Sequence, residues 1–323
     1  MRGRNWWTLA ALLLMVAVGH DAAWAQAQSN QPIKIIVPYP AGGGGDIVVR
    51  NISPGMEQAL GRSIIVENIT GATGSIGLMR TIQSPPDGNT MVYVTAINTA
   101  NAATRPNSSV NLNRDLDAVG RISQSAFVLA VSPQLGINSV QDLIALGKKN
   151  PGLRFGSTGP GSNHHLLGEM FKNATGLQMI HVPYRGEAAA IPDLIAGRID
   201  LMFLTASIAP YLDSKQLIGL GVSSAEPWFS LPQLKPLSES GLPNFVYTGW
   251  NGLMAPKGTP RDVIVRLNEA LAAAIKSDIA VKMFNISGFK PTGGPPEALV
   301  AEIDNDMKLY ERIIREQNLT FEK

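Results

Sequence analysis

One pattern occurs twice in this sequence: a short apolar run leads into a glycine-rich turn, and a segment with helical spacing of apolar residues follows. The first copy covers residues 35–60, with glycine at every position of 42–45. The second copy covers residues 153–172, with its turn at 157–162. Short β-prone runs that alternate with helices predict a parallel α/β sheet. Because the pattern has no fixed short period, it indicates two similar α/β lobes rather than a solenoid.

The same reading predicts the other elements of both lobes. Helices are expected at 47–60, 140–149 and 191–196, and in the segments that end at Arg80 and Lys172. Strands are expected at 34–37, 63–67 and 90–94 in the first lobe, and at 127–131, 153–156, 179–182 and 199–204 in the second.

The C-terminal part of the chain is expected to return to the first lobe. It crosses back through residues 247–252, and helices follow near 261–276 and 296–316. We assign residues 26–125 and 251–323 to lobe 1 and residues 126–250 to lobe 2, with two crossings that form a hinge and a ligand cleft between the lobes. The last helix has an apolar stripe that packs on another element, formed by Leu299, Ile303, Met307, Tyr310 and Ile314.

Residues 1–25 are typical of a secretory signal peptide. Arg2 and Arg4 precede an apolar run at 6–18, and Ala23 and Ala25 mark a cleavage site. The apolar run is shorter than the roughly 18 residues of a membrane span; an uncleaved N-terminal anchor is the alternative. We expect an exported, periplasmic protein. Because the sequence contains no cysteine, we expect neither a lipid anchor nor disulfides.

The charge of the chain argues against several partners. Charged residues make up 16% of the sequence, and the formal net charge is +2. This balance gives no basis for binding nucleic acid or an anionic membrane surface. No later segment is apolar over enough residues to span a bilayer, so a transport step needs a separate membrane protein. We expect a monomer without a cofactor.

The two glycine-rich loops are the strongest candidates for a binding site. A helix N-terminus presents unpaired backbone N–H groups and the positive end of the helix dipole, so it attracts anions. Glycine lets the backbone approach a ligand closely. Residues 41–46 offer such a surface on one lobe and residues 159–162 on the other. Four or five donors at roughly 1.5–3 kcal/mol each reach the about 8 kcal/mol of micromolar carboxylate binding.

Other roles for these residues stay open. The glycines can serve tight turns alone, and Asp46 and Ser162 can each cap the helix that follows. His164 and His165 are adjacent, so they point in different directions on a helix. Only Glu169 stands at the spacing of a further metal ligand, and we therefore expect no metal site. We interpret His165 as a cap or a donor near the loop.

Aromatic and basic residues flank the same segments. Tyr39, Tyr184 and Trp250 each stand beside a loop or the expected hinge. An aromatic side chain at such a place packs against a ligand or closes the core. Arg185 either pairs with a second ligand carboxylate or is solvated.

The sequence lacks the common signatures of enzymes. It has no Gly-x-Ser-x-Gly elbow, no Walker loop, no His-Glu-x-x-His and no cysteine nucleophile, and the glycine run does not continue as a dinucleotide fingerprint. An exported α/β enzyme is therefore less favoured than a binding protein without catalysis.

Six blocks, in order, resemble the extracytoplasmic solute receptors of tripartite tricarboxylate transporters, also called Bug receptors. The resemblance spans nearly all of the chain after residue 25. The blocks are 36–46, then Val66-Glu67-Asn68 with Gly71-Ala72 and Ile76-Gly77, then Pro86-Asp87-Gly88, then 157–166, then 181–186, and finally 256–260.

The resemblance implies a type II periplasmic binding-protein fold, in which two α/β lobes close on a ligand. It also implies that main-chain groups hold a ligand carboxylate, and that the receptor delivers the ligand to a two-component, ion-driven membrane permease. Tricarboxylates, dicarboxylates, acidic amino acids and aromatic acids are all candidate ligands. With the resemblance, three functions remain: a transport receptor without catalysis, which we favour, a sensory receptor of the same fold that signals to a membrane kinase, and an exported α/β enzyme. We predict that the site contains Tyr39, Ala41, Gly42, Gly43, Gly44, Gly45, Asp46, Ser157, Thr158, Gly159, Gly161, Ser162, His165, Tyr184 and Thr205.

The sequence departs from the family's pattern in two places. Ile69-Thr70 follows Asn68 where Arg-Pro is usual, and Leu204-Thr205-Ala206 replaces a common Phe/Asp-Asn stretch. The second departure lies near the expected cleft, so the resemblance does not define what contacts the far end of the ligand.

Overall fold

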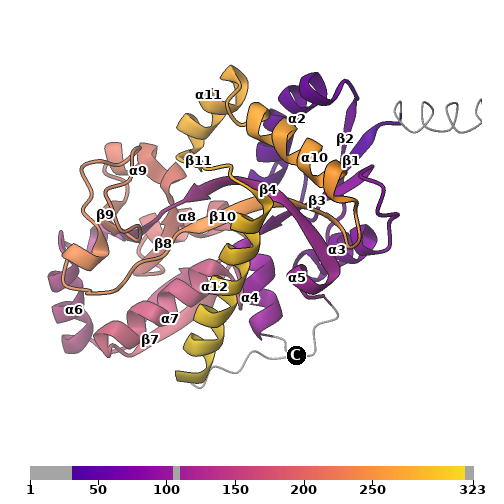
Figure 1. Ribbon diagram of the computed structural model, residues 1–323. Helices are drawn as coiled ribbons and strands as arrows, with labels where there is room; N and C mark the ends of the chain where they lie inside the picture. The colour runs from indigo at the N-terminus through magenta and orange to yellow at the C-terminus, as the bar shows by residue number, and fades with distance from the viewer. Residues whose placement is uncertain (1–30, 105–109, 317–323) are drawn as a thin grey trace, which may run out of the picture.

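The computed structural model describes residues 31–104 and 110–316 (Figure 1), and the expected signal peptide lies outside these residues. The described chain forms two sheets, each covered by helices on both faces. This is the two-lobed α/β architecture that the repeated pattern predicts. Figure 1 shows the second sheet with its helices on the left and the first sheet with α2, α3 and α10 on the right.

The first sheet has six strands in the order β11-β4-β10-β3-β1-β2. The strand β1 pairs in parallel with β2 and β3, whereas β10 runs antiparallel to both β3 and β4. The strands are β1 (Ile33–Val37), β2 (Ile64–Asn68), β3 (Thr90–Thr95), β4 (Leu116–Ser125), β10 (Gly249–Pro256) and β11 (Lys290–Pro291).

Helices cover both faces of the first sheet, and they begin and end at recognisable signals. One face is covered by α2, α10 and α11, and the other by α3, α5 and α12. The helix α2 ends where Gly61 adopts the left-handed conformation. The helices are α2 (Gly44–Leu60), α3 (Ser75–Ile82), α4 (Ala96–Thr104), α5 (Leu112–Asp115), α10 (Arg261–Ala274), α11 (Asp278–Ser287) and α12 (Pro296–Glu316).

The second sheet has five strands in the order β7-β6-β8-β5-β9, and β6 pairs in parallel with β7 and β8. Successive residues of β5 enter different cores, as Val128 and Leu129 do, because a strand alternates its side chains. The elements are β5 (Phe127–Val131), α6 (Val140–Lys149), β6 (Leu153–Ser157), α7 (Asn163–Thr175), β7 (Met179–Pro183), α8 (Glu187–Ile195), β8 (Leu201–Thr205), α9 (Ala209–Asp213) and β9 (Ile218–Val222).

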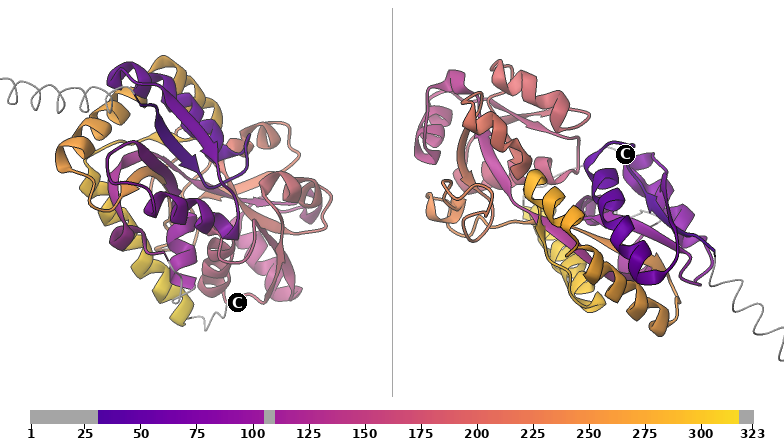
Figure 2. Two further views of the ribbon diagram at one scale, coloured as in Figure 1. Left: turned by 90° about the vertical axis from the view of Figure 1, so that its right-hand side faces the viewer. Right: turned by 90° about the horizontal axis from the view of Figure 1, so that it is seen from above.

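Two connections between the sheets lie side by side. A single residue, Ala126, separates β4 from β5. On the return, Tyr247 bonds through its N–H to the carbonyl of Ser223 beside the second sheet, and Gly249 then pairs with Ser125 in the first sheet. The two crossings are therefore neighbouring strand ends, and Figure 2 shows the two halves of the molecule as distinct bodies around them.

The helix α12 reaches from one sheet to the other. Leu299 and Ile303 pack into the core of the first sheet, whereas Tyr310 and Ile313 belong to a core cluster of the second. The expected apolar stripe is present, although Ile313 is more deeply buried than Ile314. Figure 1 shows α12 in yellow, running past β4 and alongside α4 and α7.

Several elements differ from the sequence-based expectation. The strands β4 and β9 and the helices α4 and α11 were not expected, and α8 begins at Glu187 rather than at residue 191. The expected crossing at 247–252 is part of a strand from residue 249 onwards, because β10 begins there and lies in the interior of the first sheet. This strand requires glycine at position 252, because a Cβ atom there would lie 2.7 Å from the carbonyl oxygen of Gly120.

Candidate functional site

The topology brings the predicted loops to the carboxyl edges of the two sheets. Since β1 is parallel to β2 and β3, their last residues lie along one edge, and β6, β7 and β8 end likewise along an edge of the second sheet. The helix α4 starts directly after β3 and contacts α7, which starts after the β6 loop; its Ala100 belongs to the same core cluster as Leu166 and Leu167 of α7. The two edges therefore adjoin each other, and ligands of α/β proteins bind at such edges.

The loop after β1 is tied down by Asp46. Its carboxylate accepts hydrogen bonds from the Gly42 N–H at 2.9 Å, from Arg50 Nε at 2.9 Å and from Asn68 Nδ2 at 2.9 Å. The hydrogen bond from Arg50 is the largest of the causes that lower the pKa of Asp46 to about 2. Asp46 is thus an ionised residue that positions the loop against β2.

These contacts leave a defined set of backbone donors in the first lobe. The Gly42 N–H is bound to Asp46, and the Gly43 N–H is bound to the carbonyl of Pro40 at 3.1 Å. The N–H groups of Gly44, Gly45 and Asp46 form the first turn of α2 and have no acceptor within the described chain. A Cβ atom on Gly45 would lie 2.7 Å from the ring of Tyr93, so the helix start requires glycine there.

Tyr39 contacts the protein rather than an open surface through its hydroxyl group. The hydroxyl lies 3.0 Å from Thr95 Oγ1 and donates to Asn98 Oδ1 at 3.3 Å. Its ring meets Tyr93 edge-on, and burial raises the pKa of Tyr39 to about 12. Tyr39 therefore connects the loop after β1 to the start of α4.

The loop after β6 uses most of its own donors. Ser157 Oγ accepts from the Gly159 N–H at 3.0 Å, and the Ser162 N–H bonds to the Gly159 carbonyl at 3.2 Å. The Gly161 N–H donates to His165 Nδ1 at 3.2 Å, and Ser162 Oγ caps α7. The N–H groups that remain without an acceptor within the described chain belong to Thr158, Asn163 and His164.

Behind this loop, two histidine rings are stacked. The centroids of His165 and His181 are 3.9 Å apart with an interplanar angle of 11°, and Phe155 stacks on His181. His181 Nε2 lies 2.6 Å from Ser157 Oγ. Burial lowers the pKa of both histidines to about 4, so both rings are neutral at neutral pH. His165 and His181 therefore fix the loop after β6 through their contacts with Gly161 and Ser157.

Glu187 is a residue of this edge that the sequence analysis missed. Its Oε1 accepts from His164 Nε2 at 2.8 Å and from the Thr205 N–H at 2.8 Å, and its Oε2 accepts from Thr205 Oγ1 at 2.9 Å. Thr158 Oγ1 completes the chain at 2.9 Å from His164 Nδ1. Glu187 follows Gly186 directly, and this position could have marked it as the first residue of a helix. The sequence analysis expected α8 to begin at residue 191, so it placed Glu187 outside the helix.

The other predicted aromatic residues have contacts of their own. The Tyr184 hydroxyl donates to Asp193 Oδ2 at 2.9 Å, and its N–H bonds to the Ser157 carbonyl. Trp250 does not flank an open cleft, because it is buried in β10 and donates from Nε1 to Asp306 Oδ2 at 2.7 Å. Ala41 is exposed next to Gly42 in the first loop.

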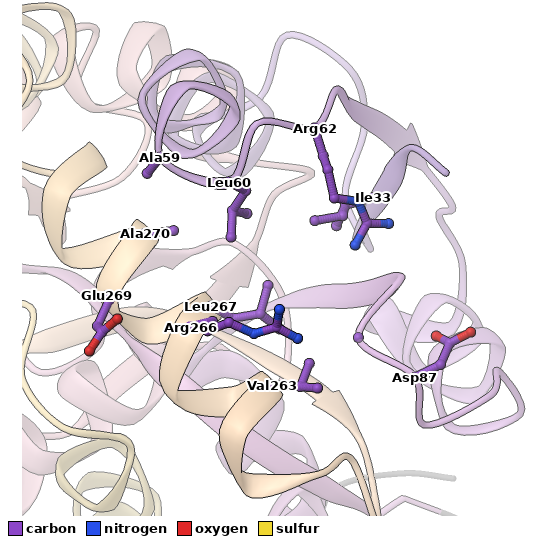
Figure 3. A pocket seen from close by; sticks show the side chains of 11 residues that line it. Ile33, Ala59, Leu60, Arg62, Asp87, Val263, Arg266, Leu267, Glu269 and Ala270 are labelled. Carbon is purple, nitrogen blue, oxygen red and sulfur yellow. The ribbon is translucent and has the colours of Figure 1, made fainter. Parts of the chain in front are cut away.

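A separate cavity of about 300 Å³ lies at the opposite end of the first sheet (Figure 3). It opens between the start of β1, the end of α2 and one side of α10, and none of the predicted site residues lines it. Figure 3 shows Arg62 and Arg266 on its walls.

Within the described residues, no helix is long and apolar enough to cross a membrane.

Comparison with known proteins agrees with this geometry. Residues 48–319 match the family described as "Tripartite tricarboxylate transporter family receptor". The chain is 32% identical to "UPF0065 protein in tcbD-tcbE intergenic region" of a Pseudomonas species, over 95% of this chain and 92% of the relative. It is 30% identical to the protein BugT of Bordetella pertussis, over 95% of this chain and 96% of BugT.

Solved structures show the same arrangement. A periplasmic transporter structure superposes with a TM-score of 0.80 at 32% identity, covering 90% of this chain and 98% of the other. A structure of an R. palustris protein with adipate has a TM-score of 0.79 at 28% identity, covering 88% of this chain and 96% of the other. The predicted two-lobed fold and the predicted family are therefore confirmed. The chain belongs to the tripartite tricarboxylate transporter family receptors and has the two-lobed α/β fold of periplasmic binding proteins.

Proposed function

We propose that this protein is a periplasmic solute receptor that binds one small organic carboxylate between its lobes and delivers it to the permease of a tripartite tricarboxylate transporter. It acts without catalysis, as a monomer, after removal of residues 1–25. Lobe 1 comprises residues 26–125 and 251–323, and lobe 2 comprises residues 126–250. The family membership and the adipate held by the R. palustris protein support this proposal.

The observation that carries the proposal is the set of free backbone donors at adjoining edges. Gly44, Gly45 and Asp46 supply three N–H groups from the N-terminus of α2, and Asn163 and His164 supply two from the N-terminus of α7. Both helix termini carry the positive end of a dipole. Five hydrogen bonds to a charged group, at roughly 1.5–3 kcal/mol each, reach the about 8 kcal/mol of a micromolar complex.

This donor set narrows the sequence-based list of binding residues. Gly42, Gly43, Gly159 and Gly161 use their N–H groups inside their own loops. We assign to these glycines, and to the side chains of Asp46, Ser157, Ser162 and His165, the role of shaping the loops. The ligand contacts then fall to the free N–H groups of the two helix starts and of Thr158.

Replacing Gly44 by leucine tests directly whether the N–H groups at the start of α2 bind the ligand. A Cβ atom on Gly44 has no atom within 4 Å, so a side chain there extends into open space without a clash inside the protein. We expect Gly44→Leu to weaken carboxylate binding at least a hundredfold in isothermal titration calorimetry while the melting temperature changes by about 2 °C or less. Ala301→Leu, at an exposed position of α12, is the matched control and keeps the affinity.

The outcome distinguishes a role of Gly44 in ligand binding from a purely structural role of this glycine. A loss of stability as large as the loss of binding would indicate that the glycine serves the turn alone. Unchanged affinity in Gly44→Leu would remove the first lobe from the site. For the transport step, a strain that lacks the receptor should regain ligand uptake with the original protein and not with Gly44→Leu.

A further inference from the structure

The edge of the second sheet that faces the expected ligand site contains a carboxylate of the protein itself. Glu187 stands at the first position of α8, and its side chain is 20% exposed. It lies at the edge formed by the ends of β6, β7 and β8, where Thr158 and Thr205 also lie. Glu187 therefore belongs to the same edge as the free N–H groups of α7.

Glu187 occupies the donors that this edge could offer to a ligand. The Thr205 N–H, the Thr205 hydroxyl and His164 Nε2 all bond to its two oxygens within 2.9 Å. A main-chain N–H, a hydroxyl and an imidazole N–H form a typical binding set for a carboxylate. Here the protein supplies that carboxylate, and a second one from the ligand would find these donors already used.

The charges around Glu187 do not offset it with a fixed cation. Its only ion-pair partner in the described chain is His164, which is charged only when protonated. Arg185 is exposed two residues earlier in the chain and forms no ion pair there with described residues. Burial by itself would raise the pKa of Glu187, but the hydrogen bonds from His164 and Thr205 outweigh it and lower that pKa. The side chain is therefore ionised at neutral pH.

We propose that Glu187 sets the ligand class: a monocarboxylate whose far end bears an ammonium or another hydrogen-bond donor, in preference to a dicarboxylate or tricarboxylate. The inference rests on the proposed function, because the ligand's own carboxylate is assigned to the free N–H groups. A second carboxylate beside Glu187 would meet a like charge in a partly desolvated site. An ammonium would instead meet an acceptor, so the same residue attracts one class and excludes the other.

The experiment uses ligands that differ only at the far end. Adipate and 6-aminohexanoate have the same chain length, as do succinate and 4-aminobutanoate, and hexanoate and butanoate lack a polar far end. Isothermal titration calorimetry at pH 7 is expected to show at least tenfold tighter binding of the amino acid than of the dicarboxylate in one of these pairs. In Glu187→Gln this ratio should fall at least tenfold, and in Glu187→Ala the dicarboxylate should bind at least tenfold more tightly than to the original protein.

Controls separate selection from folding. Glu239→Gln removes the same charge from an exposed position of the second lobe and should leave the ratio unchanged. The melting temperature of each variant is measured alongside, and Glu187→Gln keeps the size of the side chain if Glu187→Ala fails to fold.

The possible results divide cleanly. Tighter binding of the dicarboxylate to the original protein, as expected if Arg185 takes the second carboxylate, would overturn the inference. So would a ratio that Glu187→Gln does not move. Binding of hexanoate or butanoate alone would also overturn it while leaving the proposed function in place. Silence of all three series would overturn the inference. If, in addition, Gly44→Leu does not weaken the binding of any other carboxylate, the proposed function is overturned as well.

Discussion

Asp46 joins three parts of the first lobe through the Gly42 N–H, Arg50 and Asn68. Its side chain is 5% exposed, whereas Arg50 is 51% exposed, so water screens part of the ion pair. The fold lowers the pKa of Asp46 to about 2. A lowered pKa stabilises the fold above the unfolded value near 4, and this contribution disappears as the pH falls through about 2.

We therefore expect Asp46→Ala to lower the free energy of unfolding at pH 7 by about 1 kcal/mol. Asp46→Asn should lose less, because an amide oxygen still accepts the hydrogen bond from Gly42. Urea unfolding between pH 7 and pH 3 measures the difference between Asp46→Ala and the original protein. This difference should shrink below pH 4, and a constant difference would show that the ionised carboxylate has no special role.

Single residues also show where sequence reasoning about the site stops. The loops themselves were predictable, because glycine runs after apolar strands mark helix starts. Which N–H groups stay free was not, because that depends on the exact conformation of each loop: the Gly42 N–H bonds to Asp46 and the Gly161 N–H bonds to His165, each four residues away. Glu187 was hidden for a different reason, because its partner Thr205 is 18 residues further along the chain.

At the scale of elements, α7 is held to β6 and β7 by the stacked rings of His165 and His181. Burial lowers the pKa of both to about 4, below the unfolded value of 6.5. The unfolded chain therefore binds more protons between pH 4 and 6.5, so this pair makes the protein more stable as the pH rises. Each histidine adds up to about 1.4 kcal/mol per pH unit to that slope.

Replacing His181 by glutamine should reduce this slope by up to about 1.4 kcal/mol per pH unit between pH 4.5 and 6. Urea unfolding of both proteins across that range checks the expectation. Titrating groups that do not contact His181 act equally in both proteins, so the difference reports His181 together with the stacked ring of His165. Parallel curves would mean that His181 titrates normally in the fold.

The strand β10 was not expected because of its composition. The strand β10 contains glycine, asparagine and proline, which indicate turns in a sequence. In the structure, Gly252 lets two backbones approach, and Asn251 pairs with Ser123 inside the sheet. The parallel strands β1 and β3 were easier to predict, because apolar residues fill most of their length and both of their faces are buried.

For the whole molecule, the lobes are linked by buried polar side chains as well as by the two crossings. Tyr247 and Tyr310 share a hydrogen bond of 2.7 Å, and Asp306 accepts from Trp250. Tyr310 also reaches Asn163, at the start of α7, at 3.4 Å. These contacts connect α12 of the first lobe to the loop edge of the second. Burial, the largest cause, raises the pKa of Asp306 to about 7.

A raised pKa of an acid favours the fold below the unfolded value near 4, and this stabilisation is lost as the pH rises through about 7. Asp306→Asn removes the titration but keeps an acceptor for Trp250. We expect Asp306→Asn to gain stability relative to the original protein by up to about 1.4 kcal/mol per pH unit from pH 4 to 7, with no further change above. Thermal and urea unfolding across this range measure the gain, and a gain that does not vary with pH would contradict it.

The two-lobed architecture could be predicted from the sequence, because the pattern of strand, glycine-rich turn and helix is clear in both copies. The sequence did not reveal how α12 bridges the lobes, since an apolar stripe indicates burial without naming the partner. Tyr310 shows the difficulty, because it sits in the first-lobe helix and packs in the second-lobe core.

The insertion of β10 between β3 and β4 has a consequence for how the chain assembles. Strands β5 to β9 form their five-stranded sheet within residues 127–222, so that sheet can close once this segment is available. The first sheet must wait for residues 249–256, and until then β3 and β4 present open edges that can pair with other chains. As the polypeptide emerges from its N-terminus, the lobe that begins first is completed last, and its earliest strands depend longest on protection from aggregation.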